Sequence, residues 1–350
     1  MIDANKARQT GNAMFLKTTI GYAGSIFACL FFQACTLAVF EDTDKKAAKP
    51  IKPAIYQDAI QMGYLANREL NEVSGLACSR LRTDVLWAIN DSGSGPFIYA
   101  TDTQGGHLGK VRVLDARNQD WEDLASFRLR DVAYLLIADV GDNDEIRSDY
   151  VIYVTKEPAV TDKIDPAGQS VAWEYRIRFT YEDGSRDCES VAVDLQGQKI
   201  LLLSKRNVPP ILYALPLFTP NRGKVQLAKR LTEVPAIPRP KLQDIIEDPR
   251  FGAYRSQPTA MDVSPDSSTA VVLTYKNGYI FHRTAEEDWV QAFKKIPQRI
   301  RLPRLRQAEA LCFAADGKTL FVTSEKIPAP LLRLDLRGDL QTRIMYVDPS

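Results

Sequence analysis

The sequence predicts an all-β fold, a β-propeller of four-stranded blades, in residues 69–350. Two observations predict it: a pattern of short apolar strands recurs five times, and turns rich in Asp and Gly separate the strands. Each copy begins with a small or acidic residue and a short apolar strand. A more apolar strand that ends in a polar turn follows, and then a third strand rich in Tyr or Leu. Short strands at even spacing indicate four-stranded sheets repeated around an axis.

The copies start at five equivalent positions, which are Ser74, Glu122, Glu189, Thr259 and Glu309. In the first copy the three strands cover residues 74–77, 85–89 and 97–99. Fourth strands are expected at residues 110–114, 173–179, 225–231 and 298–302.

Two longer gaps between copies predict insertions, near residues 158–170 and 235–257. The second insertion has room for a sixth blade. The last blade needs a further strand to cover its edge, because open edges invite aggregation. Either residues 342–347 or a strand from residues 55–70 could supply it.

Composition narrows the possible chemistry. The 45 Lys and Arg residues balance 44 Asp and Glu, which argues against nucleic-acid binding because phosphates require a surplus of cations. The two histidines, His107 and His282, are too few for a His-rich metal site and leave little room for a Ser-His-Asp mechanism.

Three cysteines, Cys78, Cys188 and Cys312, follow the N-terminal segment. Their odd number and unrelated spacing do not indicate a disulfide framework. Two of them are expected as small core side chains.

Residues 1–41 have the pattern of an export segment. Basic residues precede an uncharged stretch at residues 18–40, and acidic residues follow it. Three outcomes remain open: lipidation at Cys35 or Cys29, retention as an uncleaved anchor, or simple cleavage. We therefore expect a monomer of the cell envelope, as a periplasmic or outer-membrane lipoprotein or an N-terminally anchored protein, or else a secreted protein. Only this segment would meet the membrane, and residues 42–68 would form a linker.

Four short motifs carry a resemblance to known proteins. They are Ser74-Gly75-Leu76-Ala77, Asn90-Asp91-Ser92-Gly93, Asp120-Trp121-Glu122-Asp123 and Gly141-Asp142-Asn143. Over residues 72–326 the chain resembles a family of uncharacterised bacterial secreted and lipoprotein β-propellers, which implies the fold and no particular activity. It is also similar, by position only, to calcium-dependent lactonase and strictosidine-synthase-like propellers. In those enzymes a Glu that opens an inner strand ligates calcium in the channel, and Glu122, Glu189 and Glu309 hold the equivalent place in this chain.

Candidate ligands are expected on one rim of the ring. In an up-and-down blade, the start of the innermost strand and the turn after the second strand lie at the same face. Clustered carboxylates repel one another unless a cation lies among them, and oxygen ligands without His suit Ca²⁺ or Mg²⁺. The candidate metal ligands are Glu122, Glu189, Glu309, Asp91 and Asp139; Asp142 and Asp144 lie in the same turns.

The equivalent turns of the later copies carry cations, namely Lys205, Arg206, Lys276 and Lys326. A metal ion flanked by cations would suit an anionic substrate. The candidate catalytic residues are Glu189 and Glu309, as ligands or general base, together with Lys205 and Lys276, which would hold the substrate anion.

The sequence therefore predicts a divalent-metal-dependent hydrolase of a small ester, with phosphoesters first. The alternative is a non-catalytic envelope propeller that binds a protein or glycan on one face. In that case the aspartates would serve only their local turns. Propellers host both roles, so the fold does not choose between them.

Overall fold

The computed structural model describes residues 55–161, 169–218 and 223–338. The chain divides into two units, Met1–Ile51 and Lys52–Ser350, and the described residues all belong to the second. The predicted export segment, its two cysteines and the candidate closing strand near the C-terminus lie outside the described residues. Within the described ranges, no helix has the length and apolar character needed to cross a membrane.

Each blade consists of four antiparallel strands, which run in chain order from the innermost outward, except that β1 is the outermost strand of the last blade. The first blade contains β2 (Val73–Cys78), β3 (Val85–Asn90), β4 (Phe97–Asp102) and β5 (His107–Leu114). The second contains β6 (Trp121–Leu129), β7 (Val132–Asp139), β8 (Tyr150–Lys156) and β9 (Gln169–Tyr181). The third contains β10 (Cys188–Asp194), β11 (Lys199–Ser204), β12 (Ile211–Pro216) and β13 (Gln226–Glu233). The fourth contains β14 (Pro258–Val263), β15 (Thr269–Thr274), β16 (Asn277–His282) and β17 (Gln298–Arg301). The fifth contains β18 (Ala308–Phe313), β19 (Leu320–Ser324), β20 (Pro330–Leu334) and β1 (Ile60–Tyr64).

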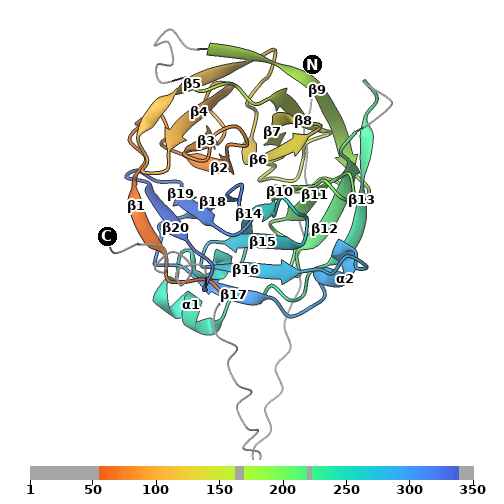
Figure 1. The fold of residues 1–350 in the computed structure, drawn as a ribbon. Helices are drawn as coiled ribbons and strands as arrows, with labels where there is room; N and C mark the ends of the chain where they lie inside the picture. Colours follow the sequence, from red (N-terminus) through yellow and green to blue (C-terminus); the bar gives the residue numbers. More distant parts are fainter. Residues whose placement is uncertain (1–54, 162–168, 219–222, 339–350) are drawn as a thin grey trace, which may run out of the picture. The chain divides into compact units, whose positions relative to one another are not determined.

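The innermost strands β2, β6, β10, β14 and β18 lie side by side in this order, and β18 returns to β2 (Figure 1). The second unit is therefore a β-propeller, and the predicted fold class is confirmed. The expected second insertion holds α1 (Leu242–Glu247) and η1 (Gly252–Tyr254) rather than strands of a sixth blade. A further short helix, α2 (Trp289–Ala292), precedes β17.

Strand β1 completes the last blade with residues from the N-terminal side of the ring. It pairs antiparallel with β20, with Ile60 opposite Arg333, and Tyr56 forms a further bridge to Leu336. This pairing covers the edge that β20 would otherwise expose. The sequence predicts a linker at residues 42–68, but residues 55–68 contribute to the propeller. This is the second of the two closing strands that the sequence leaves open.

Strand β9 joins the outer edges of three blades. It pairs antiparallel with β8 inside its own blade. Its first residues also pair in parallel with β5, where Gln169 lies opposite Val111. Its last residues pair in parallel with β13, where Phe179 lies opposite Gln226. The first three blades therefore share one continuous hydrogen-bonded edge.

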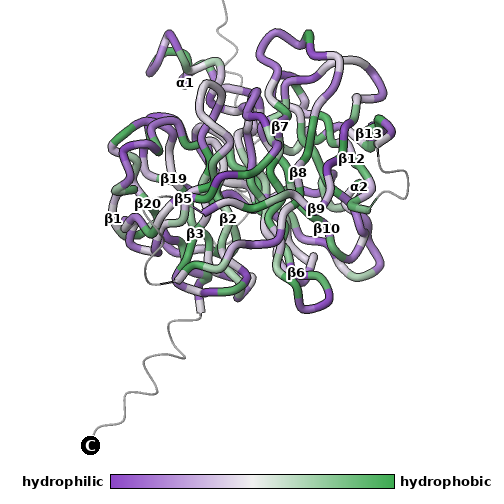
Figure 2. Tube along the Cα trace, turned by 90° about the horizontal axis from the view of Figure 1, so that it is seen from above, coloured by the Kyte–Doolittle hydropathy of each residue, from purple (hydrophilic) through white to green (hydrophobic). Residues whose placement is uncertain are grey.

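Apolar side chains pack the blades against one another. Between the first two blades, Trp87 and Trp121 are fully buried in one cluster with Leu124 and Ile137. The Trp121 indole donates a hydrogen bond to the Arg117 carbonyl at 2.8 Å, so this side chain is part of the core. Figure 2 shows apolar strand segments in the interior and hydrophilic residues mostly in the loops.

Candidate carboxylate site in the channel rim

A β-bulge occurs at the same place in every inner strand. The register with the second strand shifts around the residue that opens each sequence repeat, namely Ser74, Glu122, Glu189, Thr259 and Glu309. A bulge leaves one residue out of the ladder and changes the direction of its side chain. The repeat start in the sequence thus marks a position at which the backbone releases a side chain from the regular sheet.

The five bulge positions serve two purposes. Ser74 Oγ donates to the Trp121 carbonyl, and Thr259 Oγ1 donates to the Ala308 carbonyl, each at 2.7 Å. Both hydroxyls therefore bind the inner strand of the following blade. The other three positions carry glutamates, which are 5–8% exposed.

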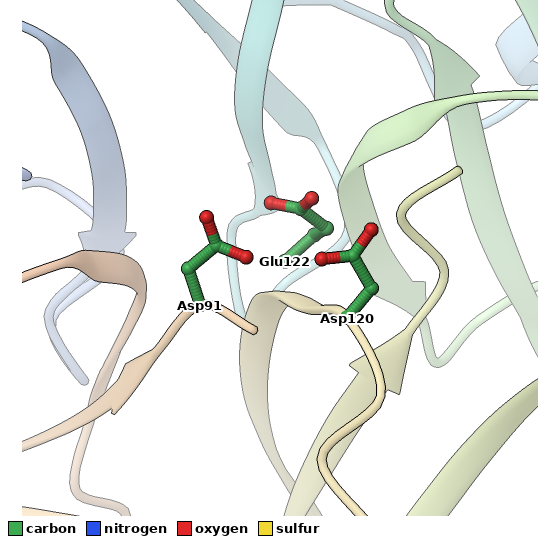
Figure 3. A group of neighbouring side chains, drawn as sticks. All are labelled: Asp91, Asp120 and Glu122. Carbon is green, nitrogen blue, oxygen red and sulfur yellow. The ribbon is translucent and has the colours of Figure 1, made fainter. Parts of the chain in front are cut away.

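A first carboxylate group consists of Asp91, Asp120 and Glu122 (Figure 3). Each offers one oxygen, and these oxygens lie within 4.8 Å of one another. Asp91 follows β3, Asp120 precedes β6, and Glu122 occupies the bulge of β6. Gly141 lies directly beside the group, because a Cβ there would overlap Glu122 Oε1 and Asp120 Oδ2. Only glycine leaves these two carboxylates in place.

A second carboxylate group consists of Glu122, Asp187 and Glu189, again within 4.8 Å, and shares Glu122 with the first. Its other two members have cationic partners. Asp187 Oδ2 lies 2.7 Å from Arg206 Nε, and Glu189 Oε1 forms an ion pair with Lys205. The main-chain N–H of Asp142 also donates to Asp187 at 3.0 Å. Basic side chains of the protein therefore neutralise most of the negative charge of the second group.

Two glutamates in this region have carboxylate oxygens to which no described residue donates a hydrogen bond. Glu189 Oε2 is buried and accepts no hydrogen bond. The Glu122 side chain is 6% exposed, and among the described residues nothing donates a hydrogen bond to its carboxylate or forms an ion pair with it. A water molecule or a cation can satisfy such oxygens.

Burial and mutual repulsion raise the pKa values of these carboxyls. Burial, followed by the hydrogen bond that protonated Asp120 donates to the Asp91 carboxylate, raises the pKa of Asp120 to about 7. Burial and then the charge of Glu189 raise the pKa of Glu122 well above its usual value. Burial also raises the pKa of Glu189 to about 7, although Lys205 opposes this shift. Without a further cation the cluster is thus poorly stabilised in its ionised form.

Glu309 approaches the same rim from the fifth blade. Burial and then the charge of Glu189 raise its pKa well above the usual value, while a hydrogen bond from the Tyr275 hydroxyl opposes the shift. The Lys205 ammonium lies 5.6 Å from the centre of the Tyr275 ring. Glu309 therefore interacts with the second group through Lys205 and Tyr275, outside the two groups of mutually close oxygens.

Two further predicted site residues, Asp139 and Lys276, also lie outside the carboxylate groups. Asp139 Oδ1 lies 2.9 Å from Arg147 Nη1, and Asp139 accepts main-chain hydrogen bonds from Gln119 and Asp120. It therefore supports the loop that carries Asp120. Lys276 forms an ion pair with Asp244 of α1, which the second insertion supplies.

The remaining turn residues have local partners or are exposed. Asp142 accepts hydrogen bonds from the main chain of Ile146 and Arg147 and, at 2.7 Å, from the Tyr150 hydroxyl. Asp144 is exposed. Lys326 forms ion pairs with Glu72 and Glu325.

Two members of the groups, Asp120 and Asp187, were not predicted. Each lies two residues before a bulge glutamate, in Asp120-Trp121-Glu122 and Asp187-Cys188-Glu189. Both lie immediately before the inner strand, and their carboxylate oxygens lie within 4.8 Å of an oxygen of Glu122. A signal was present, because the position two before each repeat start is acidic or an amide in all copies: Glu72, Asp120, Asp187, Gln257 and Gln307.

Comparison with known proteins adds little to this geometry. No protein-family model and no curated protein sequence matches the chain. Among solved structures, the chain is similar to a gluconolactonase from Xanthomonas campestris, with 12% sequence identity and a TM-score of 0.39. The match covers 83% of this chain and 99% of that one. A similarity at this level carries no argument about the activity of this protein.

Proposed function

We propose that the protein is a divalent-cation-dependent hydrolase of a small anionic ester, with Ca²⁺ or Mg²⁺ held by Asp91, Asp120 and Glu122. The observation that carries the proposal is this first carboxylate group, whose oxygens lie within 4.8 Å of one another. Among the described residues it has no ion pair with a basic side chain. Its oxygen-only donor set suits a hard cation.

The charge distribution favours the first group over the second as the cation site. Lys205 and Arg206 already neutralise Glu189 and Asp187. Among the described residues the first group has no such ion pair, and this leaves a deficit of positive charge beside Asp120 and Glu122, whose pKa values are raised first by burial. A divalent cation would remove it and allow these carboxyls to ionise.

The residues beside the cation site would bind and activate the reactants. A bound divalent cation would act as a Lewis acid on an oxygen of the ester. Lys205 and Arg206, which pair with Glu189 and Asp187 of the second group, would bind the anionic part of the substrate. The unpartnered Glu189 Oε2 would accept a proton from the attacking water. A cavity of about 50 Å³ beside Lys205, lined also by Asn207 and Arg239, could take only a small group of the substrate.

Cation binding and hydrolysis can be tested separately on the full chain. We expect Ca²⁺ or Mg²⁺ to raise the melting temperature of the metal-free protein, as ligand linkage requires. We also expect release of nitrophenol from a p-nitrophenyl phosphate ester, lost on chelation and restored by the cation. If neither cation binds, the proposal fails and the binding of a protein or glycan partner takes its place. If a cation binds but phosphate and carboxylate esters are both left intact, the hydrolase is refuted and the cation site is kept.

Gly141→Ala provides a test of the first group that leaves every ligand in the sequence. The added methyl group would displace the Glu122 and Asp120 carboxylates. We expect the cation affinity, measured by calorimetric titration, to fall by about 10–100-fold, as for other changes beside metal ligands.

Gly278→Ala is the matched control, because its Cβ would meet only the Ile300 side chain, at 3.3–3.7 Å. It should keep the affinity of the unchanged protein. An unchanged affinity in Gly141→Ala would contradict the placement of the cation.

A further inference from the structure

Two buried cysteines face each other between the first and last blades. Cys78 is the last residue of β2 and Cys312 lies in β18, and these inner strands lie side by side. Their Sγ atoms are 2.9 Å apart. Both side chains belong to one hydrophobic cluster and are 4% and 2% exposed.

We propose that Cys78 and Cys312 form a disulfide bond when the chain folds under oxidising conditions, and that this bond locks the first blade to the last. An S–S bond is about 2.05 Å long, so the two sulfur atoms need to approach by less than about 1 Å. This inference is independent of the cation site and of the proposed hydrolase.

The bond requires an oxidant, which we take to be a low-molecular-weight or protein disulfide. One cysteine thiolate attacks this disulfide and releases one thiol, which leaves a mixed disulfide on the chain. The second cysteine then attacks the mixed disulfide and releases the second thiol. In balance, the two cysteines lose two protons and two electrons, and the oxidant is reduced to two thiols.

Burial determines when this reaction occurs. The thiolate is the attacking species, and burial raises the pKa of Cys312 well above its usual value. Oxidation should therefore take place during folding, before β2 and β18 have packed together. Once the ring is closed, the same burial shields the bond from reducing agents.

The bond would have a large effect because of the length of chain that it closes. Cys78 and Cys312 are 234 positions apart, which includes nearly the whole ring. In the chain-entropy description, a cross-link stabilises the folded state more as the closed loop grows. We expect the oxidised protein to melt on the order of 10 °C above the reduced protein.

Cys188 provides an internal control. It is fully buried in β10. Its Sγ contacts main-chain carbonyls, that of Leu203 at 3.4 Å, rather than a second thiol among the described residues. Cys188 is therefore as buried as Cys78 and Cys312 but has no neighbouring thiol among the described residues, so we expect it to remain a free thiol.

The test uses the full chain, reduced, unfolded and refolded in a buffer of reduced and oxidised glutathione. The refolded protein is then unfolded in the presence of N-ethylmaleimide, which blocks the remaining thiols, and is digested with trypsin without reduction. We expect peptides 69–80 and 307–318 to appear as one linked species that separates on reduction. Peptide 187–199, which contains Cys188, should carry the blocking group.

Two variants complete the test. Cys188→Ser should keep the difference in melting temperature between the oxidised and reduced forms, and Cys78→Ser should lose it. Recovery of Cys78 and Cys312 in blocked form, or linked to another cysteine, would overturn the proposal. Because peptide mapping is done on the unchanged chain, this result does not depend on the folding of the variants.

Discussion

Glu122→Gln will abolish most of the stabilisation by calcium and will make the metal-free protein more stable. Glu122 belongs to both carboxylate groups found among the described residues, so its loss affects both of these candidate cation sites. At a free concentration 100 times its dissociation constant, a cation stabilises the folded state by about 2.7 kcal/mol through linkage. Most of this should disappear in the variant.

The gain in the metal-free state has a separate cause. Burial and the charges of Glu189 and Asp91 raise the pKa of Glu122, which means that its ionised form is unfavourable in the folded protein. Glutamine keeps the size of the side chain and removes this charge. At pH 8 without metal, the variant should therefore melt at a higher temperature than the unchanged protein.

Thermal melts with and without calcium measure both effects. Asp144→Asn is the matched control, because it removes an exposed carboxylate from the turn that follows β7. It should leave both the melting temperature and the calcium response unchanged. A Glu122→Gln protein with a full calcium response would exclude the proposed cation site.

The second large effect concerns pH. The stability of the metal-free protein will rise as pH falls from about 8 to about 5. Burial raises the pKa of Asp262 from 3.8 to about 6, and the pKa values of Asp120 and Glu189 are raised to about 7. At pH values between the ordinary pKa values of these groups and their raised ones, the folded protein binds more protons than the unfolded chain.

The sign follows from linkage. The free energy of unfolding decreases with pH wherever the folded state holds more protons. The stability from these groups is fully present below about pH 4 and is lost as pH rises through 6 to 7. For Asp262 alone the shift corresponds to about 3 kcal/mol.

Urea unfolding at a series of pH values, in metal-free buffers, measures this dependence. Saturating calcium should weaken it, because the cation favours the ionised forms of Asp120 and Glu122. The contribution of Asp262 should remain, since burial causes its shift and Asp262 belongs to neither carboxylate group. A metal-free protein whose stability increases with pH across this range would contradict the prediction.

The fold could be predicted because its signal is local and repeated. The five positions inferred as repeat starts are the residues around which the inner strands shift register. A bulge that recurs at one place in every blade imposes the same residue pattern on every copy.

What the sequence did not predict depends on contacts between distant segments. The sequence left two strands open for closing the last blade, and only the pairing of Ile60 with Arg333 decides for residues 60–64. Lys276 occupies a turn equivalent to that of Lys205, but the second insertion places Asp244 beside it. The approach of Cys78 to Cys312 likewise arises only when the ring closes.

The carboxylate site was predicted in part. Glu122, Glu189 and Asp91 were identified because they open inner strands or end second strands. The repeat pattern does not include Asp120 and Asp187, because each repeat starts at the bulge residue. Both lie just before that start, where the chain enters the blade.

The outer strand β9 has a consequence for how motion is distributed around the ring. Both carboxylate groups come from the first three blades, and these are the blades that β9 joins at their outer edges. The fourth blade is a separate four-stranded sheet, and so is the fifth. Slow breathing of the ring should therefore concentrate around the last two blades, where amide hydrogens should exchange soonest. The carboxylates would keep their spacing through such openings, held as one rigid sector whether or not a cation is bound.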